Sequence, residues 1–138
     1  MDVFVVDASM AISWVHPAQT TTESEAWLEH VAAGAELVVP SIWPLEVANA
    51  LLVLQRRRKV SAAERRDALR ALRQIPARMD NNTTAIAFGV LSDLAAAESL
   101  SVYDASYLEL AMRLCFPLSC GDAQLRAAAR RNGVAVAP

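Results

Sequence analysis

Short, wholly apolar runs separated by helical segments constrain the fold of this chain more than any other feature of its sequence. VFVV at 3–6 and LVVP at 37–40 show no polar alternation, which is typical of strands covered on both faces. Shorter candidate strands lie at 78–80, 117–119 and 134–136. The pattern predicts an α/β fold with helices on a central, mainly parallel sheet.

Helical segments fill the spaces between these strands. A first helix covers residues 10–15, and Thr22 or Ser24 is expected to cap a second, which Gly34 ends. Further helices are predicted at 44–59, 61–75, 83–98, 104–114 and 122–132. The two consecutive helices in the middle of the chain predict a protruding helical hairpin.

Length and composition bound the class of protein. The 138 residues, 54% of them hydrophobic, suit one globular domain over 1–138. No apolar run approaches the roughly 18 residues of a membrane span, and the start lacks a basic signal region. Cys115 and Cys120 are the only cysteines, which excludes a disulfide framework and a zinc signature. We therefore expect a cytoplasmic protein that does not enter the membrane.

Charge is distributed unevenly, although the net charge is only −2. No Lys or Arg precedes Gln55, whereas residues 56–78 are strongly basic. Arg56, Arg57, Arg58 and Lys59 are candidate contacts for phosphates. The alternative interpretation, a solvated helix end, is about equally consistent with this stretch alone.

Four acids stand in apolar surroundings. They are Asp7, Glu46, Asp104 and Asp122. Asp7 and Asp122 each follow a predicted strand, and ligands bind at the carboxyl ends of parallel strands. Asp104 is expected to begin a helix, and Glu46 lies one turn into the helix after the second strand. All four are therefore expected to converge at one end of the sheet.

Converging carboxylates repel one another, and a divalent cation removes that repulsion. Mg²⁺ and Mn²⁺ prefer such oxygen ligands and promote phosphodiester hydrolysis by activating water. An alternative stays open for each acid: Asp7, Asp104 and Asp122 suit helix caps, and Glu46 suits an exposed face shared with Asn49. No Ser, Cys or His has a plausible base beside it, so none is assigned as a nucleophile.

Four segments in order, VVDAS, PLEVANALL, SVYDASYLELA and SCGDAQLRAAARRNGV, together resemble PIN-domain proteins of the VapC toxin type along essentially the whole chain. The resemblance implies a three-layer α/β/α domain and an Mg²⁺- or Mn²⁺-dependent endoribonuclease. It also implies the toxin role in a type II toxin–antitoxin pair, a cognate VapB-like antitoxin and a homodimer.

Carried over by motif, Asp7, Glu46, Asp104 and Asp122 match the family's metal-binding acids. Ser9 and Asn49 match supporting polar residues, and the basic residues 56–59 would contact RNA. Cys120 stands where relatives often have Thr, and core packing is the preferred interpretation for it.

Two other functions are compatible with parts of this sequence. The same fold without hydrolysis would be an RNA- or partner-binding module. A phosphoryl-transfer protein built on Asp7 is disfavoured, because Ser9 replaces the second Asp of a haloacid-dehalogenase-like enzyme and Lys59 is the only lysine available to a receiver domain. For self-association, Trp14, Trp27 and Trp43 with the hairpin are candidate contact surface, although aromatic residues are more often part of the core.

Overall fold

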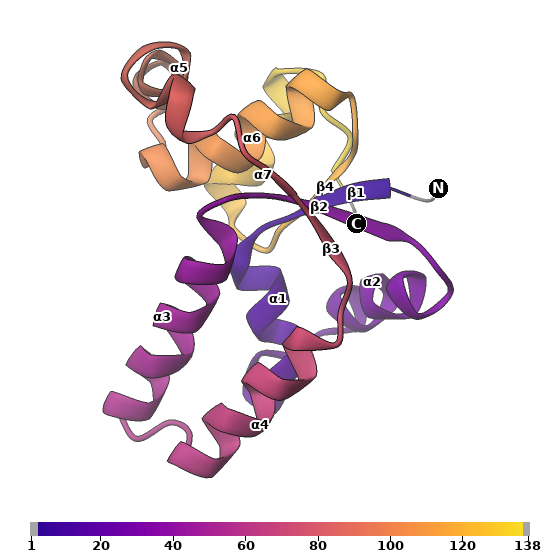
Figure 1. Cartoon of the computed structure of the whole chain (residues 1–138). Coiled ribbons are helices and arrows are strands. Elements are labelled where there is room, and N and C mark those ends of the chain that lie inside the picture. Colours follow the sequence, from indigo (N-terminus) through magenta and orange to yellow (C-terminus); the bar gives the residue numbers. More distant parts are fainter. Residues whose placement is uncertain (1–2, 137–138) are drawn as a thin grey trace.

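The computed structural model describes residues 3–136, which form three layers around a parallel sheet (Figure 1). The sheet has the order β3-β2-β1-β4, and every pairing is parallel. Its strands are β1 (Val3–Val6), β2 (Glu36–Pro40), β3 (Ala77–Asp80) and β4 (Leu118–Ser119). The predicted α/β architecture is confirmed.

Helices cover both faces of the sheet (Figure 1). One face carries α1 (Ala8–Val15), α2 (Thr22–Ala32), α3 (Trp43–Arg56) and α4 (Ala62–Arg73), with the short η1 (Pro17–Gln19) between α1 and α2. The other face carries α5 (Ser92–Glu98), α6 (Val102–Leu114) and α7 (Ala123–Arg131). Because helices cover both faces of the sheet, its central strands are apolar on both sides.

Helices α3 and α4 form the predicted hairpin, which projects away from the sheet (Figure 1). Arg58 makes the turn with a positive φ of 58°. Ser61 and Glu64 then start α4 with a reciprocal capping box, in which each backbone N–H donates to the other residue's side chain.

Three local predictions were wrong. The expected continuous helix at 83–98 is broken into η2 (Thr84–Ile86), η3 (Ala87–Leu91) and α5, because the backbone leaves helical geometry at Gly89. Thr21, not Thr22 or Ser24, caps α2, and Ser24 completes the capping box from inside the helix. The last strand, at 134–136, is reduced to one bridge between Leu118 and Val136.

The tryptophans follow the core alternative rather than forming an exposed contact surface. Trp43 is buried, and Trp14 and Trp27 pack against the core. Exposed large apolar side chains are found elsewhere, including Phe88 and Val90 on η3.

No single helix of residues 3–136 is both long and apolar enough to cross a bilayer. A bent pair, Thr84–Glu98 with Val102–Leu114, reaches that length and composition only when its two arms, 103° apart, are combined.

Candidate functional site

Asp7 is the most deeply buried of the four acids. It follows β1 directly and caps α1 by accepting a 2.9 Å hydrogen bond from the Met10 N–H. The Ser9 hydroxyl lies 2.9 and 2.8 Å from its two carboxylate oxygens. Although these hydrogen bonds favour the charged form, burial outweighs them and raises the pKa of Asp7 to about 6. The charges of Asp104 and Glu46 add to this rise.

Glu46 lies in the first turn of α3 and is half-buried. Its Oε1 accepts a 2.5 Å hydrogen bond from the hydroxyl of Tyr107 on α6. Glu46 is therefore partly buried against α6, whereas Asn49 on the same helix is exposed. Burial raises the pKa of Glu46, the Tyr107 hydrogen bond opposes this rise, and the charge of Asp104 adds to it.

Asp104 lies in the first turn of α6, which begins two residues earlier at Val102, close to the predicted helix start. Ser101 is the N-cap, and its hydroxyl accepts the Asp104 N–H at 3.0 Å. The Asp104 carboxylate is therefore not needed as a cap and is half-buried at the edge of the sheet. Burial, and then the charge of Asp122, raise its pKa.

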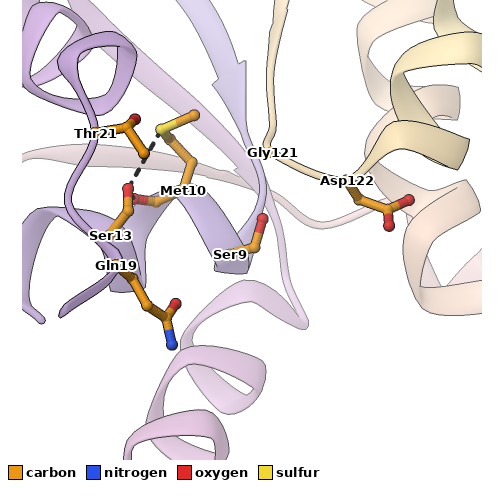
Figure 2. Close-up of a pocket in the computed structure, with 7 residues that line it drawn as sticks. All are labelled: Ser9, Met10, Ser13, Gln19, Thr21, Gly121 and Asp122. Atoms are coloured by element: carbon orange, nitrogen blue, oxygen red, sulfur yellow. Dashed lines mark hydrogen bonds between the residues drawn. The ribbon is translucent and has the colours of Figure 1, made fainter.

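Asp122 caps α7, accepting a 2.8 Å hydrogen bond from the Leu125 N–H, and it is exposed. Figure 2 shows Asp122 and Ser9 on either side of Gly121. Capping accounts for the local placement of Asp122, as the alternative interpretation expected. Its charge nevertheless acts on Asp104 and contributes to the raised pKa of that carboxyl.

Two depressions meet at Ser9. One, of about 350 Å³, is lined by Ser9, Met10, Ser13, Gln19, Thr21, Gly121 and Asp122 (Figure 2). The other, of about 410 Å³, shares Ser9 and Gln19 and extends to Glu46, Asn49 and the apolar side of α3. Together they form a groove past Ser9 that is lined by Asp122 and Glu46, whereas Asp7 and Asp104 line neither depression.

None of the four acids forms an ion pair in the described part of the chain, although Arg126 on α7 lies nearby and donates a 3.0 Å hydrogen bond to the carbonyl oxygen of Cys120. Within residues 3–136, no Lys or Arg forms an ion pair with Asp7, Glu46, Asp104 or Asp122. Asp80, which ends β3, shows the contrast: Arg113 pairs with it at 2.8 Å and lowers the pKa of Asp80. In this cluster, neighbouring carboxylates repel one another and none is held in an ion pair.

The donor chemistry of this cluster fits a hard divalent cation. All its acidic side chains offer carboxylate oxygens, and a bound cation would favour their charged form against the burial that raises their pKa values. As the side chains stand in residues 3–136, however, no three His, Cys, Asp or Glu groups already enclose one ion.

The basic residues lie far from the acids. Arg56, Arg57, Arg58 and Lys59 are exposed at the tip of the α3–α4 hairpin. Glu46 is in the first turn of the same helix, so at about 1.5 Å per residue the tip is roughly 15 Å away along α3.

Cys120 is buried, and burial raises its pKa to about 12, which keeps the thiol protonated and supports the interpretation as core packing. Tyr107 was missed by sequence reasoning. The sequence feature that could have indicated Tyr107 is its spacing from Asp104. It follows Asp104 by three residues on one helix and therefore lies on the same face.

Comparison with known proteins identifies the fold independently. A family model described as PIN domain matches residues 4–131. The crystal structure of PAE2754 from Pyrobaculum aerophilum has a TM-score of 0.70 and 21% identity, and the match covers 98% of this chain and 89% of that chain. The crystal structure of FitAcB from Neisseria gonorrhoeae has a TM-score of 0.64 and 15% identity, with 98% and 96% covered. No curated protein matches the chain.

Proposed function

The chain belongs to the PIN-domain family, whose members are generally nucleases, and from that premise we propose that it is a metal-dependent endoribonuclease. We further propose that it is a VapC-type toxin of a type II toxin–antitoxin pair. The observation that supports the nuclease most directly is the cluster of uncompensated carboxylates around buried Asp7.

Each acid has a role in this proposal. Asp7, Glu46 and Asp104 hold Mg²⁺ or Mn²⁺, and Asp122 supports them from α7. When bound, the cation supplies the positive charge that activates water and stabilises the leaving oxygen. Ser9 and the Met10 N–H keep the Asp7 carboxylate in one orientation through the hydrogen bonds described above. A single RNA strand lies in the groove past Ser9, and the basic tip attracts its backbone.

A catalytically silent RNA- or partner-binding module is the second candidate. The observation that favours it is the lack of a ready-made metal enclosure among residues 3–136. It predicts RNA binding that EDTA does not change and no cleavage products. The nuclease predicts cleavage that EDTA abolishes.

The partners follow from the family resemblance and from the surface. A VapB-like antitoxin is proposed to cover the acidic groove and block cleavage. A second copy of the chain is proposed to cover the apolar side chains of η3, where Phe88 is fully exposed.

The decisive experiment compares two Asp→Asn variants with the wild type on total RNA, with Mg²⁺ and with EDTA. Asp7→Asn is expected to lower Mg²⁺-dependent cleavage at least 100-fold, since it removes a buried ligand. Asp67→Asn is the matched control, because Asp67 is exposed on α4 and its ion-pair partner among residues 3–136 is the exposed Arg70. Full cleavage by a purified, folded Asp7→Asn variant would refute the assigned site.

A further inference from the structure

Tyr107 carries a buried hydroxyl within the acidic cluster, and the roles given above leave it unassigned. Its side chain is 1% exposed, and its hydroxyl donates a 2.5 Å hydrogen bond to Oε1 of Glu46. The charges of Glu46, Asp7 and Asp104 all act on this hydroxyl. Tyr107 therefore lies among three of the four acids and contacts one of them.

The hydrogen bond links two layers of the fold. Tyr107 is on α6, which packs on β1 and β2, whereas Glu46 is on α3, which belongs to the layer on the other face of the sheet (Figure 1). Tyr107 and Asp104 share one face of α6. One rigid helix therefore presents Asp104 itself and also holds Glu46 relative to it.

The geometry leaves half of the Glu46 carboxylate available. A phenol has one proton, so Tyr107 engages a single oxygen. Within the described residues, Oε2 of Glu46 accepts no hydrogen bond, and no Lys or Arg pairs with it. A long, half-buried Glu that is already ordered loses less conformational entropy when it binds a ligand.

We propose that Tyr107 is a positioning residue that holds Glu46 by Oε1 so that Oε2 serves as a ligand of the divalent cation. The inference rests on the proposed metal-dependent function and deepens it. Outer hydrogen-bond partners of this kind typically change metal affinity 10- to 100-fold when they are removed.

The test compares Tyr107→Phe with Tyr103→Phe. These are the two tyrosines of the chain, both on α6, and Tyr103 is 60% exposed. Mn²⁺ affinity is measured without RNA by electron paramagnetic resonance. Tyr107→Phe is expected to weaken Mn²⁺ binding 10- to 100-fold, and Tyr103→Phe by less than twofold. In cleavage assays, high Mn²⁺ is expected to restore the kcat of Tyr107→Phe, with the KM for RNA unchanged.

A double-mutant cycle separates positioning from a general effect on the fold. In a Glu46→Gln background, Tyr107→Phe is expected to cause no further loss of Mn²⁺ affinity, because the two changes act through one ligand. If Tyr107→Phe and Glu46→Gln each lowered Mn²⁺ affinity by their full separate amounts in the double variant, the inference would be overturned. A folded Tyr107→Phe variant with wild-type Mn²⁺ affinity would also overturn it.

If Tyr107→Phe does not fold, the wild-type chain labelled with 3-fluorotyrosine provides the measurement. Saturating Mg²⁺ is expected to move the ¹⁹F resonance of residue 107, and an unmoved resonance would count against positioning. Failure of the proposed function is recognisable separately: a wild-type chain that binds no Mn²⁺, or an Asp7→Asn variant that binds it normally, refutes the metal site itself.

Discussion

The hydroxyl of Ser9 lies within 2.9 Å of both carboxylate oxygens of Asp7, two residues away at the start of the same helix. This arrangement favours the charged form of a carboxylate whose burial favours the neutral form. Ser9→Ala is therefore expected to raise the pKa of Asp7 and to move the acidic limb of the cleavage pH profile upward. Ser92→Ala, at an exposed position of α5, is the control. An unchanged profile would show that Ser9 does not act on Asp7.

The raised pKa of Asp7 also predicts how the free energy of unfolding depends on pH when no metal is bound. Its pKa is about 6 in the folded chain against an ordinary value of 3.8, so the folded state holds the extra proton between these values. Stability is therefore lost as the pH rises from about 4 to about 6, and the shift corresponds to about 3 kcal/mol. Since Asn is also a good cap, Asp7→Asn is expected to raise the free energy of unfolding at pH 7 by roughly 2–3 kcal/mol, and little at pH 4. Urea denaturation in EDTA measures the free energy of unfolding of the wild type and the variant at pH 4 and pH 7. An equal effect of Asp7→Asn at the two pH values would contradict the prediction.

Arg113 is expected to be the most costly surface arginine to remove. It bridges Asp80 at the end of β3 and the buried Glu109 on α6, at 2.8 and 2.6 Å. Arg113→Ala leaves both carboxylates unpaired and is expected to cost about 2–3 kcal/mol, discounted for the partial exposure of the pair. Arg70→Ala, in an exposed pair with Asp67, is expected to cost less than about 1 kcal/mol. Similar denaturation midpoints for the two variants would contradict this ranking.

Neutralising the hairpin tip is expected to weaken RNA binding without changing the chemical step. Replacing Arg56, Arg57, Arg58 and Lys59 by Gln removes up to four phosphate contacts, each worth about 0.7 in the slope of log affinity against log salt. Fluorescence anisotropy with Asp7→Asn protein at several salt concentrations measures this slope. An unchanged slope would support the interpretation of these residues as a solvated helix end.

Phe88 is expected to contribute to self-association. It is fully exposed on η3, beside the exposed Val90. Phe88→Asp is expected to convert a dimer into a monomer in light scattering at micromolar concentration, whereas Met112→Asp, on α6, is not. A monomeric wild-type chain would remove the basis for this prediction.

The sequence predicted those features that depend on local pattern. Apolar runs indicate strands that are buried on both faces, and the geometry of parallel sheets brings the residues that follow such strands to one edge. The positions of Asp7, directly after β1, and of Asp122, three residues after β4, could therefore be anticipated. The role of Tyr107 could not be predicted, because a tyrosine in an apolar helix is typical of a core residue. Its hydrogen-bond partner, Glu46, is 61 residues away in the sequence. The break at Gly89 was also hidden, because its neighbours are compatible with a continuous helix and only the packing against α6 shows otherwise.

Glu46 lies in the first turn of α3, and the basic tip lies at and just beyond the other end of this helix. Under the proposed function, this separation sets a length scale for the RNA substrate: a strand cleaved at the acids is attracted by the tip only if it extends along the whole helix. Oligonucleotides shorter than that span would be cut at the same intrinsic rate but captured poorly, and their cleavage would respond little to salt. The length of α3 would thus set the minimum length of RNA that the protein captures efficiently, which favours long, flexible RNA over short fragments.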